Sequence, residues 1–291
     1  MQIQGHRGGF QPENTMKCFG QAIEAGIEAI EIDIWLTNDG VPIILHGGDN
    51  GELNHHFEFQ DTHYIFEKSY SELLQYDLGD GQKIPTLEDL IIFNQKRLFI
   101  NIELKVPREE NVKSRYNYLK CSEKIFELIK KHNISQNHIE TIYLMNFHQE
   151  PLPEPSAYTD LGHGINVSSK YITQEVVDLC HMNGQKVGVW VSSKVEIESD
   201  VMYERLLKMG VDFVCSDYPL SVLAAQTRYH EIHTLMNSDL ECISDQSCFS
   251  ETIEDITNFE SDQIYSESGS EKYFIDSQIS SSNYLPIYES E

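Results

Sequence analysis

A pair of carboxylates interrupts one of the most apolar stretches of the sequence, AIEIDIW at residues 29–35. Side chains alternate between the two faces of a β-strand, so Glu31 and Asp33 are expected on one face and the isoleucines on the other. Two neighbouring carboxylates repel each other and are costly to bury, and a divalent cation removes that cost. The spacing therefore indicates a metal site, with an exposed face of an antiparallel sheet as the alternative.

Three further strand-like stretches end in charged or basic side chains. Glu103 and Lys105 lie two residues apart in NIELK at 101–105. His46 ends PIILH, and His6 and Arg7 follow the first apolar stretch of the chain. In parallel α/β folds the carboxyl ends of the strands carry the chemistry, so we expect these side chains and the carboxylate pair to meet at one site.

The residue types at these strand ends fit one reaction. Three carboxylates make an oxygen-rich site that suits Mg²⁺ or Ca²⁺. Arg7 and Lys105 suit an anionic phosphate, and two histidines can share acid and base roles near neutral pH. Together they indicate metal-assisted cleavage of a small-molecule phosphodiester.

Apolar runs alternate with helical patterns over residues 1–225, which predicts a parallel sheet covered by helices. This leaves a barrel or a doubly wound sheet open. The expected strands are MQIQG, AIEIDIW, VPIILH, LFINIEL, IETIYLM, KVGVWV and FVCSD. The clearest helices begin at Asn14 or Thr15, at Thr86 with a capping box, and at Thr173.

The overall charge limits the partners. The 291 residues carry a net charge of −26, which disfavours nucleic acid and anionic membranes as main partners. The six cysteines form no CxxC pair, so buried free thiols are expected in a reducing compartment. The start of the chain lacks the apolar core of a signal peptide, and we expect a cytoplasmic location. The oligomeric state stays open.

The composition changes after about Ala225. From 226 to 291 the chain holds 14 Asp or Glu against Arg228 and Lys272, with many serines and weak periodicity. This predicts an acidic, disordered tail, for which docking or phosphorylation is the functional interpretation and a solvated tail the simpler one.

The ordered set of motifs resembles the glycerophosphodiester phosphodiesterase family. The matching motifs are HRG at 6–8, PENT at 12–15, the Glu31/Asp33 pair, His46, the Glu103/Lys105 pair and GVDFVCSDYP at 210–219. The resemblance implies a TIM (β/α)8 barrel over 1–225, with a small insertion after the third strand at about 47–83. It also implies hydrolysis of glycerophosphodiesters to glycerol 3-phosphate and an alcohol, within lipid and glycerol metabolism.

The same resemblance implies roles for individual residues. It implies a divalent metal, Mg²⁺ or Ca²⁺, on Glu31, Asp33 and Glu103. It implies His6 and His46 as the acid–base pair, with a cyclic phosphate intermediate. It also implies that Arg7 and Lys105 bind the phosphate and that Trp190 packs on the glycerol.

The sequence leaves the roles of two further acidic residues, Glu13 and Asp217, open. Glu13 can orient His6, approach the metal, or serve as a carboxylate at a helix start. For Asp217 a structural role at the end of the last strand is the leading interpretation.

Two departures from the family pattern bear on these expectations. The family commonly has Asp directly after the residue matching His46, where this chain has Gly47, so either a contact to this histidine is missing or Asp49 replaces it. The segment 148–163 is short and contains three prolines, so helix 5 of the barrel is expected to be missing, and the presence of strand 6 is left open. A substitute strand from GHGINV, a dimer or a misread gene model are the alternative explanations of this gap. Lysophospholipase D-type activity and an inactive phosphodiester-binding protein are the alternative functions.

Overall fold

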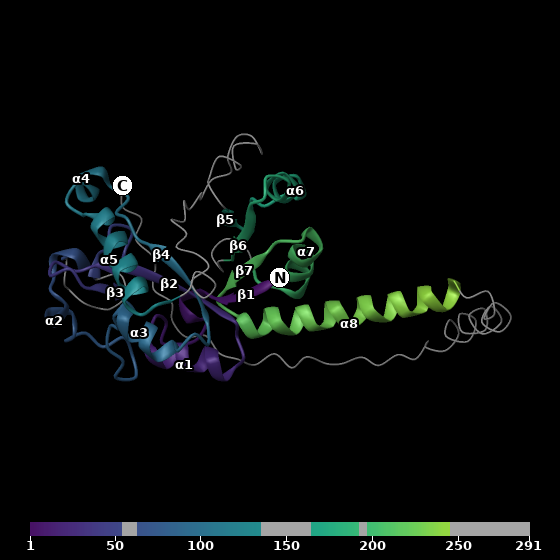
Figure 1. Cartoon of the computed structure of the whole chain (residues 1–291), viewed down its shortest axis with the longest axis horizontal. Helices are drawn as coiled ribbons and strands as arrows, with labels where there is room; N and C mark the ends of the chain where they lie inside the picture. The colour runs from purple at the N-terminus through teal and green to yellow at the C-terminus, as the bar shows by residue number, and fades with distance from the viewer. Residues whose placement is uncertain (54–62, 135–163, 192–196, 245–291) are drawn as a thin grey trace, which may run out of the picture. The chain divides into compact units, whose positions relative to one another are not determined.

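The computed structural model describes residues 1–53, 63–134, 164–191 and 197–244, the last nine of these as backbone only. Figure 1 shows the elements along the chain. They are β1 (Gln2–Gly5), η1 (His6–Gly8), α1 (Met16–Glu24), β2 (Ala29–Leu36), β3 (Pro42–Ile44), η3 (Ile65–Glu67), α2 (Tyr70–Leu73), α3 (Leu87–Asn94), β4 (Phe99–Leu104), α4 (Glu110–Lys113), α5 (Tyr118–Lys131), β5 (Gly164–Ser168), α6 (Gln174–Met182), β6 (Lys186–Trp190), α7 (Asp200–Met209), β7 (Phe213–Ser216) and α8 (Pro219–Ser244).

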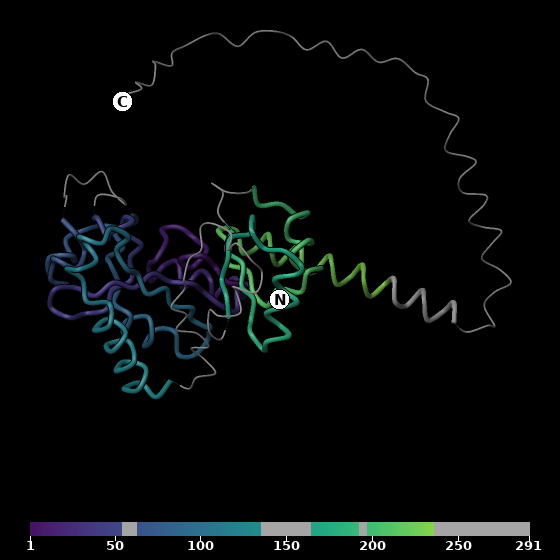
Figure 2. Tube along the Cα trace, turned by 90° about the horizontal axis from the view of Figure 1, so that it is seen from above, coloured from purple at the N-terminus to yellow at the C-terminus, as the bar shows by residue number. Residues whose placement is uncertain are grey.

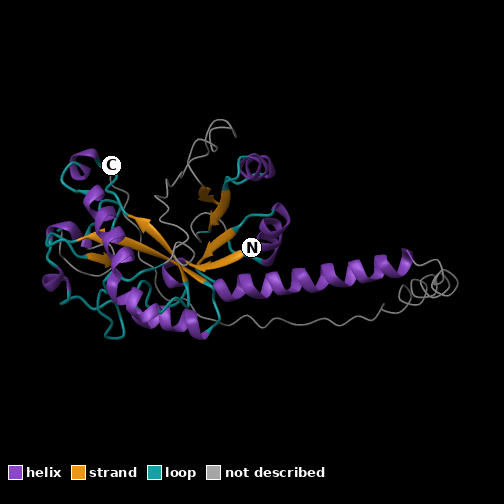
Figure 3. Cartoon of the chain, viewed as in Figure 1, coloured by secondary structure: helices purple, strands orange, loops and turns teal. Residues whose placement is uncertain are grey.

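The strands form one sheet in the order β3-β2-β1-β7-β6-β5, with β4 paired to β2. All pairs are parallel except β2–β3. Helices join the parallel strands, as Figure 3 shows, which is the strand–helix alternation of a TIM-type barrel. Register sets Glu31 opposite Asn101 and Asp33 opposite Glu103, so these four side chains share one face.

Strand β3 pairs antiparallel with β2, which corrects the expectation that it is a barrel strand. Only residues 37–41 separate the two strands. A parallel pair needs a crossover of a dozen residues or more, so this short connection forces a hairpin. The hairpin carries His46 back along the carboxyl-terminal half of β2, because Ile34 pairs with Ile44.

The expected helix starts are confirmed. Thr15, Thr86 and Thr173 are the N-caps of α1, α3 and α6, and each side chain accepts a hydrogen bond from a backbone N–H of the first turn. The capping box of α3 is complete, because the carboxylate of Asp89 accepts a hydrogen bond from the Thr86 N–H.

The core consists of two clusters of buried side chains. One joins β2, β3 and β4 to α1, α3 and α5, and includes Trp35 and Phe19. The other joins β5, β6 and β7 to α6 and α7, and includes Ile3 from β1. Figure 2 separates the same groups by colour, with purple to teal for the first and green for the second. Strand β1 is the only described strand that pairs with both groups.

Some expectations fall on residues outside the described part of the chain. These are the strand IETIYLM and the segment 148–163, together with most of the tail. The substitute strand is present, because β5 pairs with β6 from Gly164 to Ser168.

The compositional boundary after Ala225 falls inside α8, which continues to Ser244, so residues 226–244 are helical rather than disordered. By its internal contacts the chain divides into 1–233 and 234–291, and only the helical residues 234–244 of the second unit are described.

Candidate active site

Three buried carboxylates from β2 and β4 meet at the carboxyl ends of these strands. One oxygen each of Glu31, Asp33 and Glu103 lies within 4.8 Å of the others. Glu31 and Asp33 are each 1 % exposed. Parallel pairing of β2 with β4 sets this geometry, since it brings the second acidic stretch beside the first.

Two cations neutralise part of this negative charge. Lys105 Nζ lies 2.8 Å from Glu103 Oε1 and 3.2 Å from Asp33 Oδ1. Arg7 Nε lies 3.5 Å from Asp33 Oδ2, and its backbone N–H donates to Glu31 Oε2 over 3.0 Å. With three carboxylates and two cations, the cluster keeps an excess of negative charge.

The pKa values reflect this crowding. Burial and the charge of Asp33 raise the pKa of Glu31 to about 8, and burial raises the pKa of Glu103 to about 7. Burial also acts to raise the pKa of Asp33, but the charges of Lys105 and His46 outweigh it and hold this pKa well below its usual range. Burial lowers the pKa of Lys105, yet the charges of Asp33 and Glu103 leave it above its ordinary value.

The cluster fits a divalent cation. Its donors are carboxylate oxygens, the ligands that Mg²⁺ and Ca²⁺ prefer. Glu31 Oε1 is buried and accepts no hydrogen bond from the residues that the structure describes. A buried, unsatisfied carboxylate oxygen is costly, and a bound cation would satisfy it.

His6 contacts Asp217, a residue for which the sequence favoured a structural role. His6 Nδ1 lies 2.6 Å from Asp217 Oδ1. Burial lowers the pKa of His6, but the hydrogen bond that the ring donates to Asp217 and the charge of Glu31 outweigh it, so the pKa is raised. One feature of the sequence could have indicated this contact. Asp217 directly follows the strand β7, as His6 directly follows β1, so both lie at the carboxyl end of the sheet.

Glu13 and Asn14 both act on the cluster. Glu13 Oε1 accepts from Arg7 Nη1 over 2.8 Å, so Glu13 orients the guanidinium. Asn14 Nδ2 donates to Asp33 Oδ2 over 2.8 Å while its φ is 55°. The sequence placed Asn14 in the PENT motif and at a helix start, and neither pattern predicts its contact with Asp33.

His46 follows β3 and is half-buried, and its carbonyl accepts from Trp35 Nε1 over 3.0 Å. Gly47 has a φ of 68°, and a Cβ there would meet Ile65, so the chain can turn after His46 only with glycine. Asp49 is exposed and pairs with Arg108 over 3.2 Å. Asp49 therefore lies in a surface ion pair, away from the substitute role expected of it.

Trp190 ends β6 and is half-buried. Its register partners are Ser168 on β5 and Cys215 on β7. It therefore lies at the same end of the sheet as the carboxylates, on the side of β1 opposite to β2 and β4.

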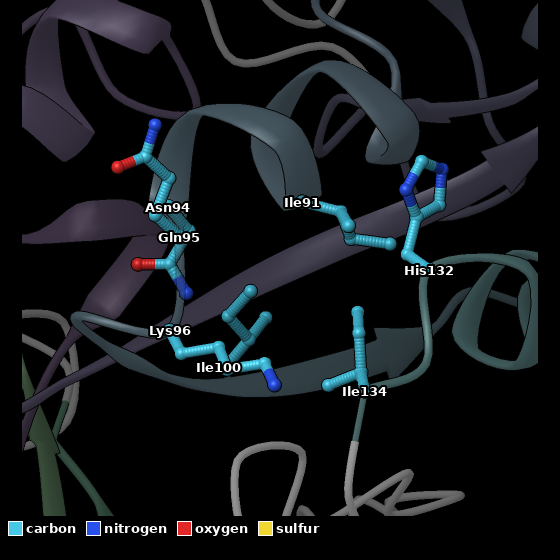
Figure 4. Close-up of a pocket in the computed structure, with 7 residues that line it drawn as sticks. All are labelled: Ile91, Asn94, Gln95, Lys96, Ile100, His132 and Ile134. Carbon is cyan, nitrogen blue, oxygen red and sulfur yellow. The ribbon is translucent and has the colours of Figure 1, made fainter.

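A separate hollow of about 140 Å³ lies near the amino end of β4 (Figure 4). It is lined by Ile91, Asn94, Gln95, Lys96, Ile100, His132 and Ile134. Ile100 is the second residue of β4, the strand that carries Glu103 near its other end, so the hollow is at the opposite end of β4 from the site. Its lining contains no carboxylate, and we assign it no chemistry.

Residues 6–221 match the model of the glycerophosphoryl diester phosphodiesterase family. The chain belongs to this family. The match begins at His6 and ends beyond Asp217, so it includes every residue of the site described above. It also identifies the chain as a phosphodiesterase, and the motif-based recognition is confirmed.

Relatives and solved structures agree with the family membership. A glycerophosphodiester phosphodiesterase of Bacillus altitudinis is 26 % identical over 75 % of this chain and 94 % of its own. One from Caldanaerobacter subterraneus is 27 % identical over 75 % and 94 %.

An Oleispira antarctica phosphodiesterase, solved with sn-glycerol-3-phosphate, has a TM-score of 0.61 and 23 % identity over 78 % of this chain and 97 % of that one. This likeness confirms the TIM-barrel fold of the phosphodiesterase. Among the described helices, none is long and apolar enough to cross a membrane.

Proposed function

We propose that this phosphodiesterase hydrolyses glycerophosphodiesters to glycerol 3-phosphate and an alcohol, using a divalent metal and two histidines. The observation that carries the proposal is the meeting of Glu31, Asp33 and Glu103 with Arg7 and Lys105 at one end of the sheet. The product bound by the Oleispira antarctica relative supports the substrate class.

Glu31, Asp33 and Glu103 would hold the metal, Mg²⁺ or Ca²⁺. When bound, the metal offsets negative charge on the phosphate oxygens as it develops in the transition state. Because Glu13 pairs with Arg7, four carboxylates face two cations, and a divalent cation would bring this set of charges to neutrality. The bound metal would thereby remove the repulsion that an anionic phosphodiester otherwise meets at the site.

Arg7 and Lys105 bind the phosphate oxygens in this proposal. Glu13 and Asp33 hold the Arg7 guanidinium from two sides, at 2.8 and 3.5 Å, which orients it before substrate arrives. Trp190 packs on the glycerol from the β6 side.

His6 and His46 exchange protons with the substrate in two steps. In the first step one histidine takes the proton of the glycerol 2-hydroxyl, whose oxygen bonds to phosphorus, and the other protonates the departing alcohol. In the second step water opens the cyclic phosphate with the roles reversed, giving glycerol 3-phosphate. The bond between His6 and Asp217 orients the ring so that Nε2 is the atom that exchanges protons.

Turnover of glycerophosphocholine tests this proposal. We expect His6→Ala and His46→Ala each to lower kcat by about 10²- to 10⁴-fold, the usual contribution of a general acid or base. His181→Ala is the matched control, because His181 pairs with Asp212 on the surface. EDTA should abolish activity, and Mg²⁺ or Ca²⁺ should restore it; normal turnover by either site variant would refute the histidine mechanism.

A lysophospholipid is the second candidate substrate, and one observation favours it. Ile197, Val201, Tyr218 and Leu220 are large apolar side chains between 49 % and 84 % exposed. They lie on the segments around Asp217, because the Asp217 N–H donates to Glu198. An acyl chain leaving the site on this side would find an apolar surface.

Comparing kcat/KM for a lysophospholipid and for glycerophosphocholine separates the two substrates. Ile197→Ser with Val201→Ser should lower kcat/KM for the lysophospholipid alone. Binding of both compounds without turnover of either would instead favour an inactive phosphodiester-binding protein.

A further inference from the structure

The carboxylate of Glu198 lies just before α7 and accepts three hydrogen bonds. Tyr203 Oη donates to Oε2 over 2.5 Å, and Ser216 Oγ donates to the same oxygen. The Asp217 N–H donates to Oε1 over 3.4 Å. All three donors are neutral, and two of them belong to the carboxyl end of β7.

These bonds lead directly to the site. Asp217 Oδ1 is the atom that contacts His6 Nδ1, at 2.6 Å. Glu198 therefore holds the backbone of the residue that holds the ring of His6. The contacts Glu198–Asp217–His6 join the start of α7 to the end of β1 through the Glu198 side chain, the backbone and side chain of Asp217, and the His6 ring.

Burial shows which parts of this chain are rigid. Tyr203 is 1 % exposed and Ser216 is fully buried, so two of the donors are fixed by packing. The Asp217 side chain, in contrast, is 40 % exposed. Packing restrains a side chain that is 40 % exposed less than a buried one, so the orientation of Asp217 depends more on where its backbone is held.

The charge of Glu198 suits this position. Hydrogen bonds to an ionised carboxylate are about twice as strong as those between neutral groups. Glu198 also directly precedes Ser199, the N-cap of the ten-residue helix α7, where a negative charge is favoured. A glutamine in its place would keep the oxygen acceptor but lose this charge.

We propose that Glu198 is a positioning residue for His6, acting through Asp217. By fixing the Asp217 backbone, Glu198 keeps the Asp217 carboxylate on Nδ1 of His6. This favours the tautomer with the proton on Nδ1 and leaves Nε2 to exchange protons with the substrate. The inference rests on the proposed function only for the role of His6.

The kinetic test uses Glu198→Ala, Glu198→Gln, Asp217→Asn and the double variant Glu198→Ala/Asp217→Asn. We expect Glu198→Ala to lower kcat by about 10- to 100-fold, the effect of misplacing a catalytic group by about 1 Å, with KM changed less than about twofold. Glu198→Gln should recover part of the loss. Because Glu198 acts through Asp217, the kcat of the double variant should lie within about twofold of the kcat of Asp217→Asn.

Glu204→Ala is the matched control, since Glu204 lies on the same helix and pairs only loosely with Lys208, at 3.8 Å. It should leave kcat unchanged. Multiplicative losses in the double variant, or a lower Tm with kcat unchanged in Glu198→Ala, would overturn the inference.

Nitrogen NMR of the His6 ring provides a readout that needs no turnover. We expect the Nδ1-protonated tautomer in the wild type and a mixture of tautomers in both Glu198→Ala and Asp217→Asn. An unchanged tautomer in Glu198→Ala would refute the positioning role even if the wild type hydrolysed no glycerophosphodiester. Full activity of Glu198→Ala beside an inactive His6→Ala would refute this inference while leaving the proposed function intact.

Discussion

His6 and Asp217 are 211 positions apart in the sequence, yet their side chains are 2.6 Å apart. Strand β1 pairs with β7 through four consecutive residues, and both residues follow directly at the carboxyl ends of these strands. A contact of this kind depends on which strands are neighbours. The motifs identified His6 as a catalytic candidate, but Asp217 gained its role only when the sheet order was known.

We expect Asp217→Asn to shift the pH–rate profile to lower pH. The hydrogen bond and charge of Asp217 raise the pKa of His6 against the opposing effect of burial, so their loss lowers it. The limb of the pH–rate profile that depends on the pKa of His6 shifts to lower pH, whether His6 acts as an acid or as a base. The profile of kcat/KM measures this, with Asp80→Asn, in a surface ion pair with Lys17, as control. A limb at unchanged pH would contradict the assignment.

The metal-free protein should lose stability as pH rises. Glu31 and Glu103 have folded-state pKa values of about 8 and about 7, above their ordinary value. The folded state therefore binds more protons than the unfolded state in this window, and the free energy of unfolding falls as pH increases towards 8. Thermal unfolding in EDTA at several pH values measures the effect.

A divalent cation binds the deprotonated carboxylates, so its stabilising effect should grow over the same pH window. At a hundred times its Kd, a cation would stabilise the fold by about 2.7 kcal/mol. Glu31→Gln should remove most of this gain. A shift in Tm that is equal at pH 5.5 and pH 8 would contradict the site.

At the scale of elements, the packing of β6 on β7 depends on a single glycine. A Cβ at Gly188 would collide with the ring of Phe213, which is 4 % exposed. We expect Gly188→Ala to lower the free energy of unfolding by about 1–3 kcal/mol, the usual cost of overpacking a core. Urea denaturation measures the change.

Gly20→Ala is the matched control for this substitution. Its Cβ would lie 3.7 Å from Phe93, an ordinary contact, within helix α1. Alanine is the better helix former, so this variant should be neutral or more stable by up to about 1 kcal/mol. Equal losses at the two glycines would show that the Phe213 contact is not the cause.

The elements differ in how far the sequence predicted them. Caps such as Thr86 and Thr173 are local signals, so the helix starts were correct. The predicted direction of β3 was wrong, although the connection of five residues at 37–41 is too short for a parallel pair and indicates a hairpin. The continuation of α8 beyond Ala225 was not predicted. The acidic, serine-rich composition after this residue indicates disorder, although the segment also contains helix-forming residues. Hydrogen bonds between residues close in sequence determine the helix caps, whereas the direction of β3 and the length of α8 depend on the elements that pack beside them.

At the scale of the whole molecule, two core clusters share one central strand. Strand β1 pairs with β2 through only two residues, Gln4 and Gly5, but with β7 through four. The β2–β4 cluster and the β5–β7 cluster therefore have separate cores with a narrow connection. The chain has the architecture of its family, but its two parts need not have equal stability.

Native-state hydrogen exchange should detect two cooperative units. We expect amides of β5 and β6 to open at a lower free energy than amides of β2 and β4, because the second cluster is the smaller. Amides of β1 should follow the β7 group, with which they form the longer pairing. One common opening free energy for all strands would contradict this expectation.

The central place of β1 also has a consequence during synthesis. The ribosome makes β7, the partner with which β1 forms its longer pairing, more than two hundred residues after β1. At a translation rate of about 5–20 residues per second, roughly 10–40 s pass between the synthesis of β1 and that of β7. Throughout this time the nascent chain carries the HRG motif without β7 beside it, so His6 can contact Asp217 only near the end of translation of the barrel.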